Sequence, residues 1–316
     1  MSKSLFAILI SIIINAISIN ALAQGSLLDD LDAIPVDSTT IQETSTEKKE
    51  RVYNTFIGNR LINGQSTEML NKSVLEFNIA HRFGRVNSGW REFFGLDQAS
   101  MRIGLQYGIL DQLSVGVGRS TYLKTFDLYA KGKLLEQKVH GMPISAVAFT
   151  SIAFDTRKDL YPDDRPTYFS HRVSYSAQLL ISRKFCEWFS LQIAPTMVHN
   201  NIVETRADKN TLFLMGVGAK FRVIERMGIT AEYYARIKDN PNNGMHDALA
   251  IGFDYFTGGH VFQVQITNAQ AMFEQGFMRQ TSGNFFKGDI HLGFNMTRTF
   301  GLGGKERKKK STVVVE

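Results

Sequence analysis

The sequence predicts an all-β protein: a transmembrane, antiparallel up-and-down β-barrel of about twelve strands, with a flexible acidic N-terminal leader and a basic C-terminal tail. Three observations predict it. The chain opens on an export signal, its middle consists of runs of alternating polar and apolar residues, and the connections between these runs alternate in length. No apolar stretch after Gln24 is long enough for a membrane helix, and in lipid only helices and closed barrels satisfy every backbone hydrogen bond.

Residues 1–23 have the features of a secretory signal peptide. Lys3 supplies the positive charge, an apolar run extends from Leu5 to Ile19, and Ala21-Leu22-Ala23 forms a small-x-small cleavage pattern. An uncleaved membrane anchor is the alternative, but the run is short for a span of about 20 residues. We therefore expect an exported chain that begins at Gln24.

The two ends of the mature chain carry opposite charge. Residues 24–52 form an acidic leader that is rich in Ser and Thr and has no aromatic residue, which predicts a flexible segment. Residues 301–316 form a basic tail that we expect to be solvated in the periplasm. The net charge of +6 is modest and no nucleic-acid-binding motif is present, so we expect no nucleic-acid partner.

Period-two alternation dominates the region between these ends. In Met101–Tyr107 the odd positions are apolar and the even positions are polar or Gly, and Ile229–Ala235 alternates in the same way. Such runs have the length of a strand that crosses a bilayer at a tilt. We predict strands over 74–83, 101–109, 112–120, 124–135, 144–154, 171–183, 188–198, 210–223, 227–237, 246–256, 260–268 and 288–300.

The connections between these strands separate a membrane barrel from a soluble β-sandwich. Short ones fall at 110–111, 184–187, 224–226 and 257–259, and long ones at 84–100, 155–170, 199–209, 238–245 and 269–287. The joints at 121–123 and 136–143 fit this alternation less well. Outer-membrane barrels have short periplasmic turns and long external loops, whereas sandwich strands are shorter and have no such asymmetry. The sequence therefore favours a bacterial outer-membrane barrel over 74–300, with both termini in the periplasm.

The segment 53–73 stands before the first predicted strand. Its first part, Tyr53–Ile62, has a strand-like composition, but a thirteenth spanning strand would place the N-terminus outside the cell. We expect this segment to lie at the periplasmic mouth or to fold into the lumen as a plug.

Three segments resemble a known family. They are YNTFIGNRLINGQSTE (53–68), the stretch 75–135, and FFKGDIHLGFNMTRTF (285–300), and their most specific parts are HRFGR (81–85) and FGLDQA (94–99). They closely resemble the domain-of-unknown-function 5777 family of bacterial envelope proteins, which are described as β-barrels. The resemblance implies the same fold and compartment, and it brings no functional residues with it.

If the apolar faces of the strands contact lipid, the opposite faces line the lumen. Eight basic and four acidic residues then point inward: Glu76, Arg82, Arg102, Asp127, Lys131, Lys133, Arg172, Lys220, Arg222, Glu232, Arg236 and Asp254. Rings of Arg and Lys lower the barrier for anions, so one hypothesis is a passive or gated pore for small polar or anionic solutes. The alternative is a structural or binding barrel, plugged by ion pairs, that works with an envelope partner.

Other chemistry has weaker support in the sequence. Ser174 and Ser176 lie near His171, but no G-x-S-x-G string occurs, so we predict no catalytic residue and no enzyme. His171 and His199 fall on adjacent strands, but strand ends around a rim seldom converge, so we predict neither a metal site nor a cofactor. The partners that we expect are outer-membrane lipid, a small polar solute and a periplasmic protein.

Two further features have a plain interpretation. Trp90, Phe93 and Phe94 lie in the first long loop, and we expect them to pack that loop onto the barrel wall, with contact to a ligand or partner as the alternative. Cys186, the chain's 1 cysteine, cannot form an internal disulfide, and we expect an unreactive thiol.

Overall fold

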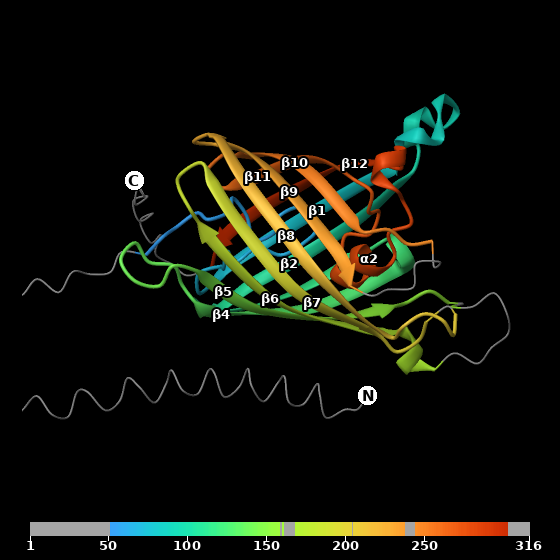
Figure 1. The fold of residues 1–316 in the computed structure, drawn as a ribbon, viewed down its shortest axis with the longest axis horizontal. Coiled ribbons are helices and arrows are strands. Elements are labelled where there is room, and N and C mark those ends of the chain that lie inside the picture. Colours follow the sequence, from blue (N-terminus) through green and yellow to red (C-terminus); the bar gives the residue numbers. More distant parts are fainter. Residues whose placement is uncertain (1–50, 159, 161–167, 204, 238–243, 303–316) are drawn as a thin grey trace, which may run out of the picture. The chain divides into compact units, whose positions relative to one another are not determined.

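The twelve predicted strands form a closed antiparallel barrel in which each strand pairs with its neighbours in the chain and β1 pairs with β12 (Figure 1). This computed structural model describes residues 51–158, 160, 168–203, 205–237 and 244–302. The expected signal peptide, the acidic leader up to residue 50 and the tail from residue 303 lie outside the described residues. No helix in the described ranges has the length and apolar character needed to cross a membrane.

The prediction of the fold is confirmed, with strand ends displaced by three residues or fewer. The strands are β1 (Val74–Arg85), β2 (Ala99–Leu110), β3 (Leu113–Ser120), β4 (Thr125–Leu135), β5 (Ser145–Asp155), β6 (Val173–Lys184), β7 (Phe189–Asn200), β8 (Thr211–Ile224), β9 (Met227–Ile237), β10 (Ala248–Phe256), β11 (His260–Thr267) and β12 (His291–Gly301).

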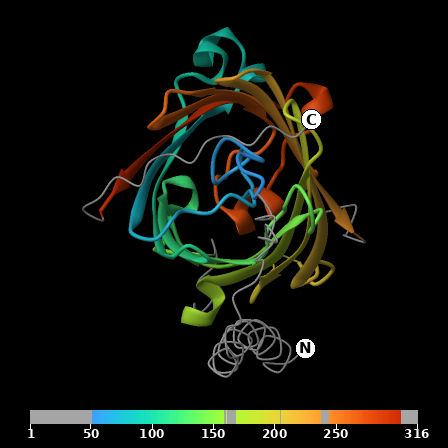
Figure 2. The ribbon, with the colours of Figure 1, turned by 90° about the vertical axis from the view of Figure 1, so that its left-hand side faces the viewer.

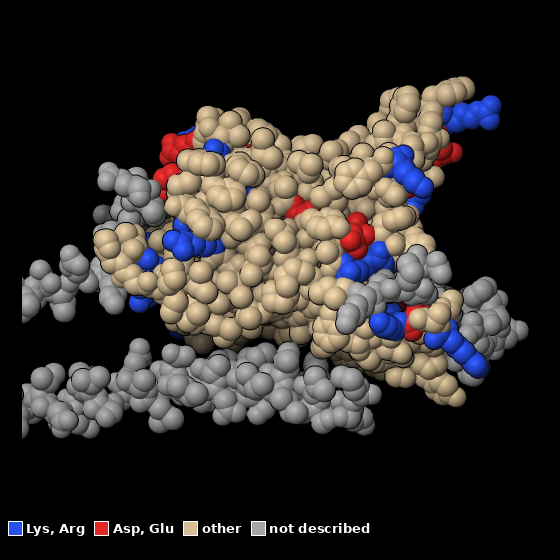
Figure 3. Space-filling view, in the orientation of Figure 1, with Lys and Arg blue, Asp and Glu red and all other residues tan. Residues whose placement is uncertain are grey.

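The barrel is apolar outside and polar inside. Along β2 the outward residues Ile103 and Leu105 are each 42% exposed, whereas the inward residues Arg102 and Gln106 are 1% and 3% exposed. A water-soluble protein would reverse this pattern, because exposed apolar area in water is unfavourable. In Figure 3 most of the barrel's visible surface is free of charged groups, which is the surface that a lipid environment requires.

The two ends of the barrel differ. One end carries the connections β2–β3, β6–β7, β8–β9 and β10–β11, each of four residues or fewer, together with the longer connection between β4 and β5; we call it the turn end. The other end, the loop end, carries the remaining connections. Among these is the short 3-10 helix η3 (Tyr122–Lys124), which fills the joint that the sequence pattern left ambiguous.

Two segments enter the barrel, one from each end. Residues 52–70, which we call the N-terminal insert, enter at the turn end, where the Val52 amide donates to the Gln137 carbonyl oxygen (3.0 Å). Residues 269–281, which we call the loop insert, belong to the β11–β12 connection and include the helix α2 (Glu274–Arg279). Figure 2 looks into the turn end and shows the blue N-terminal insert and the orange-red α2 inside the ring of strands.

Candidate functional site

The tip of the N-terminal insert is anchored by one buried carboxylate of the barrel wall. Residues 61–64 form a turn in which the Leu61 amide donates to the Gly64 carbonyl oxygen (2.9 Å). The three backbone amides of Ile62, Asn63 and Gly64 therefore point the same way, and all donate to the Glu232 carboxylate at 3.2, 2.8 and 3.0 Å. Consecutive amides of this kind form an anion-binding concavity, and Glu232 supplies its anion from β9.

Wall lysines bind the carbonyl oxygens of the same insert. The Lys131 ammonium donates to the carbonyl oxygens of Asn59 (3.2 Å) and Glu68 (2.8 Å). The Lys220 ammonium donates to the carbonyl oxygen of Asn54 at 2.9 Å. The insert has little regular secondary structure, so its backbone groups need partners elsewhere. The charged wall supplies those partners.

Three further wall residues hold the N-terminal insert from the β1–β12 side. Arg82 donates to the side-chain oxygens of Asn63 (2.9 Å) and Asn295 (3.0 Å), and its side chain has no exposed area. The Asn295 amide donates to the carbonyl oxygen of Ile62 at 3.0 Å. Glu76 on β1 accepts a hydrogen bond from the Asn59 amide group at 2.5 Å.

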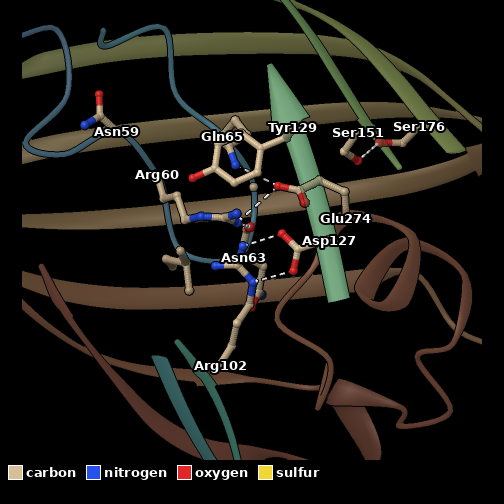
Figure 4. Close-up of polar contacts among 12 residues, drawn as sticks. Asn59, Arg60, Asn63, Gln65, Arg102, Asp127, Tyr129, Ser151, Ser176 and Glu274 are labelled. Carbon is tan, nitrogen blue, oxygen red and sulfur yellow. Dashed lines mark hydrogen bonds and ion pairs between the residues drawn. The ribbon is translucent and has the colours of Figure 1, made fainter. Parts of the chain in front are cut away.

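The two inserts meet inside the barrel at Glu274. Its carboxylate is fully buried, accepts a hydrogen bond from Gln65 (2.8 Å) and pairs with Arg60 (3.1 Å) (Figure 4). Arg60 and Gln65 belong to the N-terminal insert and Glu274 belongs to the loop insert, so these three residues, which we call the latch, join the inserts directly. Together the inserts shield the middle of the lumen, where Arg82, Asp127 and Lys131 are each 0% exposed.

The loop insert is held by different forces. Ala271, Phe273, Phe277 and Met278 join a buried apolar cluster with wall residues such as Tyr234, whose ring meets that of Phe277 edge-on at 5.0 Å. Gln275 adds a hydrogen bond to the Ser151 hydroxyl at 2.9 Å. The loop insert therefore packs mainly as an apolar core, whereas the N-terminal insert combines buried apolar side chains such as Phe56 and Ile62 with charged wall groups that bind its backbone.

Small wall residues make room for the N-terminal insert. A β-carbon added at Gly218 would collide with the Leu61 side chain, and one added at Gly252 would lie 3.2 Å from the Ile62 side chain. Gly228 has the same relation to Ile57 at 3.2 Å. Glycine thus occupies the wall positions that the insert crosses, and the missing side chains leave space for those of the insert.

The structure divides the twelve candidate lumen residues into groups. Seven contact the inserts or each other deep in the barrel, namely Glu76, Arg82, Arg102, Asp127, Lys131, Lys220 and Glu232, and Asp254 is buried beside them with Gln263 and Thr230. Arg102 and Asp127 pair across β2–β4 at 3.0 and 2.5 Å. Lys133 and Arg222 lie at the turn end in ion pairs with Glu136 (3.0 Å) and Glu187 (2.7 Å). Arg236 pairs with Asp247 (3.2 Å) at the loop end.

Arg172 departs from its predicted place in a strand. It ends the 3-10 helix η4 (Phe169–Arg172), and β6 begins only at Val173. Its guanidinium donates to the backbone oxygens of Asp155 (3.1 Å) and Lys158 (3.0 Å), which belong to the end of β5 and the loop that follows. Arg172 precedes β6, so its side chain is outside the sheet. It holds the loop that follows β5 at the loop end of the barrel.

Sequence reasoning missed the latch. Arg60 and Gln65 precede the first strand and so have no alternation to mark them, and Glu274 lies in a long connection. One signal was present: Ala269–Met278 is rich in apolar residues, which is unusual for a solvent-exposed loop. That composition indicates a buried loop.

The weaker candidates have ordinary surroundings. The His199 ring pairs with the Thr211 hydroxyl (2.8 Å), and the His171 ring packs edge-on against Tyr168 at 5.2 Å. Within the described ranges no three His, Cys, Asp or Glu side chains gather as a metal site would require. Ser176 shares a hydrogen bond with Ser151 (2.7 Å). The expectation that Trp90, Phe93 and Phe94 pack onto the wall is wrong, since they are 76%, 60% and 53% exposed.

Comparison with known proteins agrees with the barrel. Residues 56–300 match the family described as "Membrane bound beta barrel domain (DUF5777)". The chain belongs to this family. The match covers the N-terminal insert from Phe56, every strand and the loop insert, so both inserts fall within the family's domain. The chain is therefore a membrane protein, and the resemblance of its sequence segments to this family is confirmed.

Solved porin structures are similar at a low level, and no curated protein matches. The NanC porin has 7% identity and a TM-score of 0.44, over 72% of this chain and 98% of the porin. The KdgM porin has 9% identity and a TM-score of 0.43, over 72% and 99%. The COG4313 outer membrane channel from Pseudomonas putida F1 has 10% identity and a TM-score of 0.44, over 74% and 97%. At these scores we infer nothing about solute or activity from them.

Proposed function

We propose that the protein is a gated pore of the bacterial outer membrane for small polar or anionic solutes, without enzymatic activity, and that the N-terminal insert is its gate. The observation that carries the proposal is the contrast between the two inserts. A barrel filled permanently for stability can rely on an apolar core alone, as around Phe277, whereas the backbone of the N-terminal insert is bound by the charged groups of Glu232, Lys131 and Lys220.

The wall behind the N-terminal insert is suited to water. If the insert leaves, its carbonyl oxygens and the wall lysines lose their hydrogen bonds to one another and form hydrogen bonds with water instead. The net cost is only about 0.5–1.5 kcal/mol for each hydrogen bond. The latch and the contacts of Glu232 would be lost at the same time. The loop insert, held by apolar contacts, would stay. Opening from the turn end would therefore break mainly polar contacts of the backbone, and it would also expose the side chains of Phe56, Leu61 and Ile62.

The charge of the vacated wall supports anionic or polar solutes. The N-terminal insert now binds the ammonium groups of Lys131 and Lys220 through its backbone oxygens, so its departure frees both. The buried charges that remain are balanced, since Arg82, Arg102, Lys131, Lys184 and Lys220 stand with Glu76, Asp127, Glu232, Asp254 and Glu274. Such a mixed lining passes small polar molecules, and the freed ammonium groups of Lys131 and Lys220 give anions local binding positions.

Support for the outer membrane comes from three sources. The family is described as membrane-bound, the strands expose apolar faces, and the sequence predicts an export signal. With short turns facing the periplasm, the N-terminal insert enters from the periplasmic side. A periplasmic partner that binds the leader would then be placed to withdraw the insert.

A second candidate has its own supporting observation. The full burial of Arg82, Lys131 and Glu274 in a hydrogen-bonded network is also what a permanently plugged structural or binding barrel would contain. In that protein the insert never leaves, and the barrel serves as a scaffold for an envelope partner.

A reversible lock separates the two candidates. The hydroxyl oxygens of Thr67 in the insert and Ser182 on β6 lie 2.5 Å apart, so a Thr67→Cys/Ser182→Cys pair can form a disulfide, with Cys186→Ser to remove the native thiol. Single-channel current is recorded in a planar bilayer over a range of voltages. A gated pore gives transient openings that the disulfide abolishes and a reductant restores, and each single-cysteine variant should behave like the unlocked protein.

Silence of the unlocked protein at every voltage and salt gradient would contradict gating, provided that the refolded barrel shows its heat-dependent gel shift. That result would favour the permanently plugged barrel.

A further inference from the structure

A cluster of exposed aromatic side chains stands on the first long loop. Trp90 is 76% exposed, Phe93 60% and Phe94 53%, and Phe286 in the neighbouring β11–β12 connection is 89% exposed. Residues of this kind scatter singly on many surfaces, but a group on one protrusion indicates an interaction surface.

The backbone of this loop has a defined, strained conformation. Phe93 (φ 44°) and Phe94 (φ 55°) are both left-handed, a conformation that bulky side chains rarely adopt. Strain of this kind persists only where the surroundings impose it. Gly95 (φ 85°) provides one such constraint, since a β-carbon there would meet the Gly84 backbone carbon at 2.6 Å. The backbone conformation of the loop thus holds its aromatic rings in exposed positions.

The root of the loop is tied to the β11–β12 connection. Asp289 accepts hydrogen bonds from the Asn87 amide group (2.7 Å) and the Asn284 backbone (2.9 Å), and the Val86 amide donates to the Ile290 carbonyl oxygen (2.8 Å). The Asn284 and Asn87 hydrogen bonds lower the pKa of the Asp289 carboxyl, which therefore stays ionised at neutral pH. The two loops form one supported structure.

The position of this structure decides what it can contact. Figure 1 shows the loop beyond the loop end of β1 and β2, and Figure 2 shows it outside the ring of strands. It therefore overhangs the outer face of the barrel wall, where Met101 and Ile103 of β2 are exposed to lipid. In Figure 3 the protrusion is mostly uncharged, with basic atoms near its end and acidic atoms nearer the barrel. Arg91 is the loop's one Lys or Arg, with its guanidinium 6.0 Å from the Trp90 ring centre, and Glu92 and Asp97 are its acidic residues.

We propose that residues 86–98 form a lipid-surface anchor, in which Trp90, Phe93 and Phe94 enter the headgroup region of the leaflet at the loop end. The cluster lies on the outer side of the ring, beyond the loop end of the apolar wall, so one lipid surface can contact both. Indole and phenyl rings are favourable in the headgroup region, and Arg91 beside them can bind a lipid phosphate. A protein or glycan partner would instead need the rings to face water.

The chain's 2 tryptophans make the anchor measurable, because Trp90 lies at the loop end and Trp188 at the turn end. Trp188→Phe leaves Trp90 as the sole reporter, and Trp90→Phe leaves Trp188, in the β6–β7 connection at the turn end, as the matched control. Each refolded variant is placed in vesicles of phosphatidylcholine and phosphatidylglycerol, with or without acyl chains brominated close to the headgroup.

We expect the brominated lipid to remove about half or more of the Trp90 emission, with a blue-shifted maximum and little quenching by aqueous iodide. Phe93→Ser/Phe94→Ser in the same background should reduce that lipid quenching at least about twofold, since the rings share one surface. Strong iodide quenching with no effect of brominated lipid on Trp90, while Trp188 responds to the lipid, would overturn the proposal and indicate a partner in the aqueous phase.

Discussion

The barrel contains ion pairs of similar geometry that differ in their exposure to water. Arg102 on β2 and Asp127 on β4 meet through two hydrogen bonds, and their side chains are 1% and 0% exposed. Arg157 and Asp155 at the loop end form a pair of similar geometry, but the Arg157 side chain is 37% exposed. The same chemistry therefore has different consequences at the two places, because water can replace a lost partner only at the second.

Arg102→Ala should destabilise the barrel by about 3–5 kcal/mol, since it leaves the buried Asp127 carboxylate without its partner. Arg157→Ala, the matched control, should cost no more than about 1 kcal/mol. Unfolding of each variant by guanidinium from lipid vesicles, followed by tryptophan fluorescence, gives both free energies. Equal losses for the two variants would mean that water reaches Asp127.

Single residues also mark where sequence reasoning stops. The inward position of Arg82, Lys131 and Glu232 was predictable, because a strand alternates faces with period two and one face must contact lipid. Their partners were not predictable. Glu232 binds Asn63, which is 169 residues away along the chain, and no periodicity encodes such a contact. Arg172 was misplaced because its residue type fits the alternation although the backbone has already left the sheet.

At the scale of elements, the N-terminal insert is fitted to the wall by glycines. The Leu61 side chain occupies the space where a side chain at Gly218 would lie. A larger residue at this wall position can be accommodated only if the insert moves, because the β-barrel wall is fixed by its hydrogen-bond ladder on both sides.

Gly218→Val should therefore displace the insert and expose Arg60 to protease. An overpacking cost of about 1–3 kcal/mol corresponds to about a fivefold to hundredfold rise in the displaced population, and trypsin cleavage after Arg60 should accelerate accordingly. Mass spectrometry of timed digests of the refolded protein measures this rate. Gly132→Val on β4, where an added β-carbon has nothing within 4 Å, is the control and should leave the rate unchanged. Unchanged cleavage in Gly218→Val would show that the insert does not depend on this seat.

The elements differ in how far the sequence reveals them. Each strand was predicted because one of its faces contacts lipid and the other faces a polar interior. Its residues therefore alternate between apolar and polar along the sequence. The inserts satisfy neither condition. Their residues contact the wall on all sides, so they show no regular alternation of polar and apolar residues. The sequence therefore predicted only that residues 53–73 lie at the periplasmic mouth or in the lumen. The apolar composition of Ala269–Met278 was the one local sign that a second insert exists.

At the scale of the whole molecule, the barrel and its contents have separable roles. The wall closes on itself through β1 and β12 without help from either insert, so its fold depends on the membrane and the strand ladder. In the proposed function the inserts determine whether a solute can pass. Strand number and strand order were predictable because each spanning strand leaves one run of alternating residues in the sequence, and short and long connections alternate between the runs. The state of the lumen was not, since a barrel of this size can be filled or open.

The central claim is that the N-terminal insert closes the lumen, and single-channel conductance of a chain lacking residues 52–70 tests it most directly. The barrel wall is complete without these residues, and a heat-dependent gel shift verifies that the variant is folded. We predict a silent or briefly opening intact protein, and steady steps from the shortened chain whose anion permeability falls when Lys131 or Lys220 is changed to Gln. Equal conductance of the intact and shortened chains, or silence of a demonstrably folded shortened chain, would contradict the account.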